Sequence, residues 1–302
     1  MKNAINYYYN LTPDNIHQTG LTYKFDINNE LYVLMPYTRN NEDIDEILGI
    51  TYGLNKNGVY TNQIVFNKDN TPLTKINDST YIMIKAPKNN KLITLDDITY
   101  FSNVTVKEYK SPILSRNDWY NMWIEKIDYI EYQINNFGKK FPLIRSSISY
   151  VIGLAENAIM LMSNIQKEKM RYLSVSHKRI DNNFTLFDLY NPINFIIDSR
   201  IRDVSEYFKF CFFYKKIDEK DVITYIINNN LIKEEIIMLF ARMLFLTPYF
   251  DIYESIIEGY IDEENITDII EKIPDYENFI KRLYAYINYN YSIGEIEWLK
   301  KT

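Results

Sequence analysis

Cysteine and histidine are almost missing from this chain of 302 residues, which contains one cysteine and two histidines. A single cysteine cannot form an internal disulfide and is typical of a reducing compartment. No Cys/His group has metal-ligand spacing, which excludes zinc chemistry. Cys211 lies in the apolar run F-K-F-C-F-F-Y, where we expect a small buried hydrophobe rather than a nucleophile.

Long apolar runs and excess positive charge are also missing. Residues 1–10 contain no apolar run of signal-peptide length, and no uninterrupted span could cross a bilayer. We therefore expect a cytoplasmic protein without a membrane span. The net charge is −6 with a pI near 5.2, which argues against nucleic acid as a partner even though the chain has 28 tyrosines.

Residues 1–86 have the pattern of a strand-rich lobe with one helix. The pair Asn28-Asn29 is typical of a hairpin turn. Residues 40–57 form the predicted helix, with Asn41 as its N-cap and Gly58 as its stop. The predicted strands are 22–27, 30–37, 62–67 and 80–86.

Residues 87–114 form a connector that begins the second lobe, and their pattern does not distinguish strand from helix. Residues 115–302 are predicted to form a helical lobe. Its first helix is capped by Asn117 and its second covers 146–166. The region 218–299 then reads as amphipathic helices punctuated at Pro248, Gly259, Pro274 and Gly294. The predicted fold class is α+β with two lobes.

The segment 173–213 inside the helical lobe carries the pattern with most bearing on function. It begins with L-S-V-S-H-K-R-I, an apolar strand that ends at His177. A second short strand, F-I-I-D, ends at Asp198, and the acidic turn after it leads into the amphipathic helix R-D-V-S-E-Y. This order is the active-site framework of phosphotransferases with the protein-kinase fold.

Several separated motifs resemble those of one family. They are the tryptophan-bearing helix with Trp119 and Trp123, G-L-A-E-N-A-I at 153–159, the strand end at His177, R-D-V-S-E-Y at 202–207 and E-I-E-W-L at 295–299. In these features the chain resembles the CotS/YutH-type spore coat proteins of Firmicutes, kinase-like relatives of aminoglycoside and choline phosphotransferases. The resemblance implies a bilobal protein-kinase-like fold and an association with the spore.

Phosphoryl transfer depends on a few parts that position and neutralise the phosphates. A loop that covers phosphates needs glycines, but Gly20 is the only glycine before residue 40. The strand lysine is also missing, since residues 31–35 contain none. Lys24 and Glu46 are the weak candidates for binding a cofactor, and a solvated strand lysine and an exposed helical carboxylate are the plainer interpretations.

The catalytic carboxylate belongs two residues after the histidine, and Arg179 stands there. A guanidinium cannot act as a base. Asp181 could replace it only if the loop were reorganised. His177 itself is expected to support the loop through hydrogen bonds rather than to react.

The metal pair of such a site would be an asparagine and an aspartate. Asn182 or Asn183 could supply the first, and Asp188 or Asp198 the second. One carboxylate without a firm partner makes a weak Mg²⁺ site. Asp203 and Glu206 instead fit an acidic first helical turn.

The preferred hypothesis is therefore a catalytically inactive kinase-fold protein that binds another protein, as a structural or regulatory component associated with the spore coat, and needs no cofactor. The first alternative is an atypical phosphotransferase that uses ATP and Mg²⁺, with Asp181 or Asp188 acting beside Lys24. The second is an α+β interaction module unrelated to kinases, binding through its tyrosine-rich end at 284–291. The contacts of Arg179 help to interpret the site: a salt bridge to Asp198 or Glu46 would indicate a structural ion pair, and an open pocket would indicate an anionic ligand.

Overall fold

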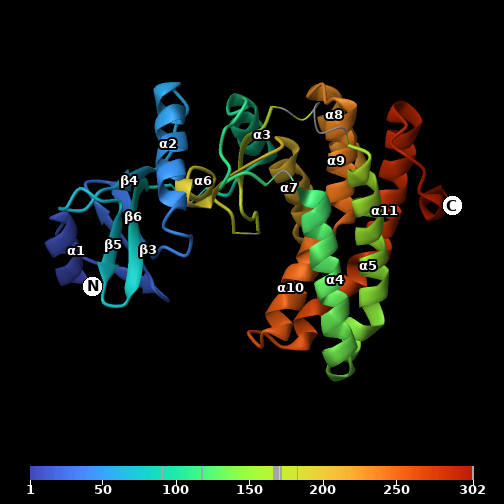
Figure 1. The fold of residues 1–302 in the computed structure, drawn as a ribbon, viewed down its shortest axis with the longest axis horizontal. Helices are drawn as coiled ribbons and strands as arrows, with labels where there is room; N and C mark the ends of the chain where they lie inside the picture. Colours follow the sequence, from blue (N-terminus) through green and yellow to red (C-terminus); the bar gives the residue numbers. More distant parts are fainter. Residues whose placement is uncertain (90, 117, 166–169, 171, 182, 301–302) are drawn as a thin grey trace. The chain divides into compact units, whose positions relative to one another are not determined.

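The computed structural model describes residues 1–89, 91–116, 118–165, 170, 172–181 and 183–300. The chain forms two compact units (Figure 1). Unit 1 comprises Met1–Thr105, Lys110–Ser115 and Asn183–Ile196, and unit 2 comprises Val106–Tyr109, Arg116–Asn182 and Ile197–Thr302.

Unit 1 is built on a six-stranded antiparallel sheet. Strand β6 pairs with β3 along one side and with β4 and β5, placed end to end, along the other. Strands β2 and β1 extend the sheet beyond β3. The strands are β1 (His17–Thr19), β2 (Thr22–Ile27), β3 (Glu30–Pro36), β4 (Gln63–Val65), β5 (Leu73–Ile76) and β6 (Ser79–Pro87).

The β2–β3 hairpin turns at the predicted asparagine pair. Asn28 and Asn29 have φ angles of 51° and 64°, and Ile27 pairs with Glu30 directly across the turn. Asparagine tolerates this left-handed backbone better than most residues do, because its short polar side chain can hydrogen-bond locally. The predicted turn is confirmed.

Helix α1 (Lys2–Tyr9) and strand β5 are among the elements of unit 1 that were not predicted. Ile5 and Tyr9 of α1 pack with residues of the sheet into one buried cluster. The Tyr9 hydroxyl lies 2.7 Å from the Thr74 hydroxyl of β5, so it also has a hydrogen-bond partner. The two elements stabilise each other by contacts that their own polar sequences do not reveal.

Helix α2 (Asp43–Lys56) begins later than predicted. Asn41 is not its N-cap: the helix starts after Glu42, which makes no side-chain capping bond. Arg39 lies at this end instead. Its Nε donates to Asp43 at 2.7 Å, and its Nη1 donates to the carbonyl of Phe195, also at 2.7 Å. Gly58, with φ 77°, follows the end of the helix as predicted.

Two further helices of unit 1 begin with capping boxes. Helix α3 (Leu95–Val104) lies in the region whose structure the pattern left open, and Thr94 and Asp97 cap it. The short helix α6 (Leu186–Leu189) has the same arrangement with Thr185 and Asp188.

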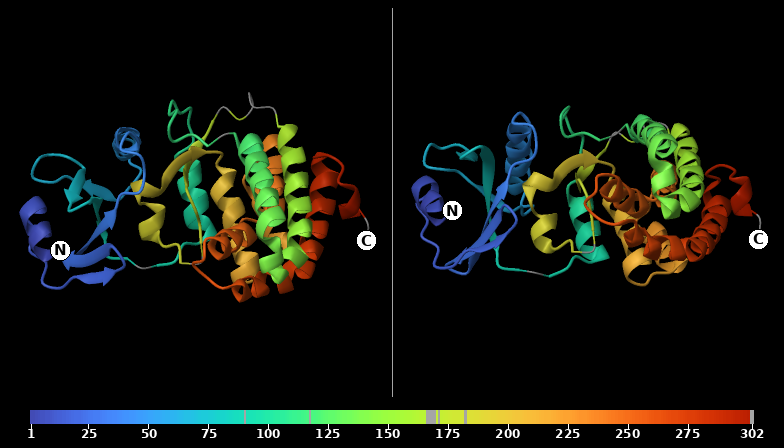
Figure 2. Two further views of the ribbon diagram at one scale, coloured as in Figure 1. Left: turned by 60° about the horizontal axis from the view of Figure 1, so that its bottom comes forward. Right: turned by 90° about the horizontal axis from the view of Figure 1, so that it is seen from below.

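Unit 2 consists mainly of helices, several of which run side by side (Figures 1 and 2). The pairs α4–α5, α5–α9 and α7–α9 are packed together. The helices are α4 (Trp119–Phe137), α5 (Pro142–Ser163), α7 (Ile201–Tyr214), α8 (Glu219–Asn228), α9 (Lys233–Leu244), α10 (Thr247–Ile257), α11 (Thr267–Tyr291) and α12 (Glu297–Lys300). Strand β7 (Ser174–His177) pairs with β8 (Phe195–Asp198), whose last two residues belong to unit 2, in a separate two-stranded sheet.

Two predicted helix boundaries in unit 2 differ from the observed helices. Helix α5 begins at Pro142 rather than at residue 146, because proline is well suited to the first turn. Pro274 does not end a helix: α11 continues through it, and residues on both sides of it, such as Ile269 and Tyr276, are buried. The predicted cap Asn117 lies outside the described residues.

Among the described helices, none is by itself both long and apolar enough to cross a membrane. Helices α9 and α10, bent by 40° at the break between them, meet the length and composition criteria only as a pair.

The hairpin turn gives a direct test of the unit 1 fold. Replacing Asn29 with Ala should lower the free energy of unfolding by about 1 kcal/mol, because alanine pays a steric cost at positive φ. Asn29→Gly should match or exceed the wild type, since glycine has no such cost. Urea denaturation of the full chain measures both variants, and an alanine variant as stable as the glycine variant would contradict the assigned turn.

Candidate functional site

The predicted strand end at His177 is held by a buried aspartate. Asp203, in the first turn of α7, accepts a hydrogen bond from the His177 backbone N–H at 3.1 Å. Its other oxygen lies 2.6 Å from Nδ1 of the same histidine. Burial acts to raise the pKa of the Asp203 carboxyl, but His177 and Arg202 outweigh it and hold this pKa below its usual range. The ionised carboxylate therefore accepts from Nδ1–H, as expected of a histidine that supports a loop.

Arg202 fixes the backbone that follows this histidine. Its guanidinium donates to the carbonyl of His177 and, at 2.9 Å, to the carbonyl of Lys178. The arginine side chain is 8% exposed. Two successive carbonyls of the turn thus have a buried, charged donor, which makes the turn rigid.

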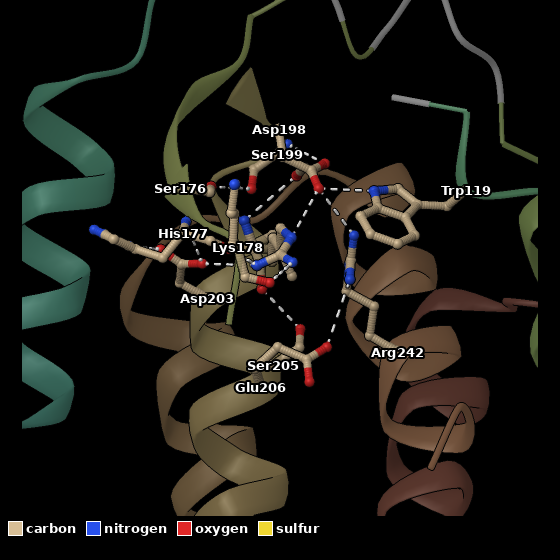
Figure 3. Close-up of polar contacts among 12 residues, drawn as sticks. Trp119, Ser176, His177, Lys178, Asp198, Ser199, Asp203, Ser205, Glu206 and Arg242 are labelled. Atoms are coloured by element: carbon tan, nitrogen blue, oxygen red, sulfur yellow. Dashed lines mark hydrogen bonds and ion pairs between the residues drawn. The ribbon is translucent and has the colours of Figure 1, made fainter. Parts of the chain in front are cut away.

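Asp198, at the end of β8, is surrounded by donors (Figure 3). Oδ1 accepts from the backbone N–H of Ser199 at 2.7 Å. Oδ2 accepts from the indole N–H of Trp119 at 2.7 Å and from Arg242 at 3.1 Å, and Arg202 Nε lies 3.2 Å from it. Burial raises the pKa of this carboxyl, and the two guanidiniums oppose that effect.

The charges continue from Asp198 into the helices. Arg242 of α9 is 2% exposed, its guanidinium carbon lies 4.3 Å from the centre of the Trp119 ring, and its Nη1 lies 3.5 Å from Glu206. Lys209 contacts Glu206 at 2.9 Å and donates to the Thr247 hydroxyl at 2.7 Å. Burial lowers the pKa of Lys209 to about 8, although Glu206 opposes the shift.

These side chains make up what we call the buried charge network. It contains three acids and three bases, so its formal charge is balanced. Its members are Asp198, Asp203, Glu206, Arg202, Arg242 and Lys209.

Within unit 2, Arg179, at the position of the catalytic carboxylate, is paired with Asp251 and not with Asp198. Its Nη2 donates to Asp251 of α10 at 2.7 Å, and its side chain is 58% exposed. It lines two cavities of unit 2, of about 230 and 240 Å³. Asp181 is exposed on the same turn. The candidate Asn182 lies outside the described residues.

The remaining candidates lie in unit 1, and Glu46 makes contacts of its own. This half-buried helical residue accepts hydrogen bonds from the Ser111 hydroxyl and from the backbone N–H groups of Ile113 and Leu114, the last two at 3.4 and 3.3 Å. It therefore orders the turn at 111–114. The plainer interpretation of Glu46 as an exposed carboxylate is wrong.

Lys24 and Asp188, by contrast, line the same cavity. Both line a cavity of about 600 Å³ in unit 1, together with Asn183 and the apolar side chains of β3. Lys24 is exposed on β2. Asp188 uses Oδ2 to accept from the backbone and hydroxyl of Thr185, at 2.9 and 2.8 Å.

The two aspartates that the sequence offers to a magnesium ion, Asp188 and Asp198, already accept hydrogen bonds from protein groups. Both oxygens of Asp198 are occupied by N–H donors. Asp188 has one oxygen committed to the cap. Over the described part of the chain, no group of three His, Cys, Asp or Glu side chains could hold a metal ion.

The sequence did not single out Arg242, Lys209 or Asp251 as members of a site. The sequence does indicate that Arg242 and Lys209 are buried, because each is a lone cation in an apolar run. The runs are I-I-M-L-F-A-R-M-L-F for Arg242 and F-K-F-C-F-F for Lys209. A buried cation must have a partner. The partner's identity is not readable from the run.

Comparisons with known proteins agree with this architecture. The family model described as "Spore coat putative kinase YutH" matches residues 2–283. Among solved structures, the chain is similar to an aminoglycoside phosphotransferase from Alicyclobacillus acidocaldarius, with a TM-score of 0.63, 10% identity and 94% of each chain covered. It is also similar to the amicoumacin kinase hAmiN, with a TM-score of 0.58, 12% identity, and 99% of this chain and 96% of that one covered. The predicted kinase-like phosphotransferase fold is confirmed, and no curated protein matches.

The network predicts a specific dependence of stability on pH. Asp203 and Glu206 have lowered pKa values in the folded protein. Their stabilisation is complete above the unfolded pKa values of about 4 and is lost as the pH falls further. The unfolding free energy should therefore fall below about pH 4. Asp203→Asn should lower it by about 3 kcal/mol at pH 7 and make the acid decline shallower.

Urea unfolding between pH 7 and pH 3 measures both effects. Asp128→Asn is the matched control: this aspartate is exposed on α4, so its variant should stay within about 0.5 kcal/mol of the wild type. An Asp203→Asn variant with the wild-type acid decline would show that Asp203 is not linked to protons in this way.

Proposed function

The chain belongs to the YutH family of spore coat proteins with a kinase-like fold, and we propose that it uses this fold to bind a partner and does not transfer phosphate. One observation carries the proposal: Asp198, the carboxylate that ends β8, is enclosed by the Trp119 indole, the Ser199 N–H and two guanidiniums. In a phosphotransferase such a carboxylate binds the metal ion.

Recruiting Asp198 for a metal would be costly. The ion would have to displace Arg202 and Arg242, both of which are buried. Removing one partner of a buried ion pair costs about 3–5 kcal/mol, because the other charge is left uncompensated. Two positive side chains beside the incoming cation would add repulsion.

The position of the base supports the same conclusion. Arg179 cannot accept a proton. The carboxylate in contact with it, Asp251, is engaged by its guanidinium. Proton abstraction at this turn therefore has no carboxylate in the place that the fold's usual reaction requires.

The role that remains is structural or regulatory. The family name supports an association with the spore coat, and we propose a protein partner there. Nucleic acid fits poorly with a net charge of −6.

A second candidate is an atypical phosphotransferase centred on unit 1. It is favoured by one observation, that Lys24 and Asp188 line the same cavity of about 600 Å³. Lysine is a common phosphate ligand. The carboxylates in that lining are Asp26 and Asp188.

Nucleotide assays separate the two candidates. We expect no thermal shift with Mg·ATP, and no transfer of label from radioactive ATP to a cell extract above the background without the protein. Asp188→Asn should behave as the wild type does. A shift of several degrees that disappears in EDTA, or labelling that the Asp188→Asn variant loses, would refute the non-catalytic proposal.

A further inference from the structure

We propose that the cavities around Arg179 in unit 2 bind a small organic oxyanion, a carboxylate or phosphate group attached to an apolar body. The proposal goes beyond a binding role by naming the chemical class of a ligand and its site. It requires neither nucleotide nor metal.

The site consists of two neighbouring cavities of about 230 and 240 Å³. They share five lining residues: Arg179, Ile180, Glu206, Thr247 and Asp251. The ion pair between Arg179 and Asp251 therefore borders both. A ligand in either cavity can reach the guanidinium.

Arg179 has donors to spare. A guanidinium carries five N–H groups in a planar fork, and one of them donates to Asp251. Its side chain is 58% exposed. The two residues before it are held by Arg202 through their carbonyls, so the fork is presented from a rigid turn. Carboxylates and phosphates bind such a fork with two parallel hydrogen bonds.

The charge of the lining favours an anion over an amine. Two carboxylates line the cavity of about 230 Å³: Glu206 is neutralised by Lys209 and Arg242, and Asp251 is paired with Arg179. A third carboxylate, Asp181, lines the cavity of about 240 Å³. Five cations line the cavity of about 230 Å³: Lys126, Lys178, Arg179, Arg202 and Arg242. Of these, Lys126 is paired with Glu254, and Arg202 and Arg242 are paired with Asp198. Among the described residues that line the cavity of about 230 Å³, an ammonium group would find no carboxylate without a basic partner.

The remaining wall is apolar and planar. Trp123 and Phe245 are stacked with ring centres 4.5 Å apart and planes inclined by 10°. Met122 and Ile180 complete the apolar side of the cavity. Such walls bury the body of a ligand while a few polar groups orient its head.

Asp251 competes with the ligand for Arg179. Burial raises the pKa of Asp251 to about 6, although Arg179 opposes the shift. Protonation below pH 6 would release the guanidinium, so an oxyanion should bind more tightly at pH 5.5 than at pH 7.5. The charged and titratable groups near Asp251 are Arg179, Lys126, Glu206, Lys209, Tyr214 and Glu254.

Tryptophan fluorescence can test the site in the full chain. Trp119 and Trp123 line the cavity, and the third tryptophan, Trp298, is replaced by Phe so that only these two report. Benzoate and phenyl phosphate are the probes, and benzylamine is the cationic control of similar shape. We expect saturable binding of at least one oxyanion, and the tighter probe identifies the preferred head group.

Variants then locate the binding. Arg179→Gln should weaken oxyanion binding about tenfold or more, the effect of losing a charge-assisted hydrogen bond. Arg282→Gln is the matched control, because Arg282 is similarly exposed at 56% and pairs with Glu219 elsewhere in unit 2. Asp251→Asn should tighten benzoate binding at pH 7.5 and abolish its dependence on pH between 5.5 and 7.5. Benzoate itself stays ionised over that range, as an ordinary carboxylate does.

The proposal is overturned if neither oxyanion binds saturably, if benzylamine binds more tightly, or if Arg179→Gln binds as the wild type does. Unchanged thermal unfolding of the Arg179→Gln variant confirms that its fold is intact. No nucleotide or magnesium is present, so these outcomes are separate from the outcome of the ATP assays.

Discussion

The contact of Asp198 with Arg202 and Arg242 is the interaction on which the rest of unit 2 depends. It joins the end of β8 to α7 and α9, and the indole N–H of Trp119 adds α4. Burying one charge without compensation is prohibitive. Three acids and three bases therefore have to be buried together, and each helix that supplies one must dock where its partner lies.

The same contact limits the chemistry of the site. A metal ion would have to displace the two buried guanidiniums that Asp198 neutralises, so the stability of unit 2 and metal binding would compete for one side chain. The same contacts also support the turn that carries Arg179. Arg202 bridges Asp198 and the carbonyls of His177 and Lys178, and so gives Arg179 a rigid support beside an apolar wall.

Much of the fold was predictable because its signals are local. The β2–β3 hairpin follows from an alternating pattern around Asn28-Asn29, and α4 from a helical face whose members Trp123, Ile127 and Ile130 are buried. The sequence-based prediction failed where packing between residues distant in the sequence determines the local structure. Helix α1 exists because Ile5 and Tyr9 cover the sheet, and α11 passes through Pro274 because its buried face continues on both sides.

Three groups of a phosphotransferase site can be seen to be missing from the amino-acid sequence alone: a glycine loop, a strand lysine in residues 31–35 and a carboxylate at Arg179. Absences of this kind can be read directly, because a residue type is either present at a position or not. The ion-pair partners of the charged side chains, by contrast, depend on the fold. Arg242 is 44 residues from Asp198 and Asp251 is 72 residues from Arg179. Periodicity shows which face of a helix is buried. Which acidic side chain pairs with a buried cation on that face depends on how elements distant in the sequence pack together.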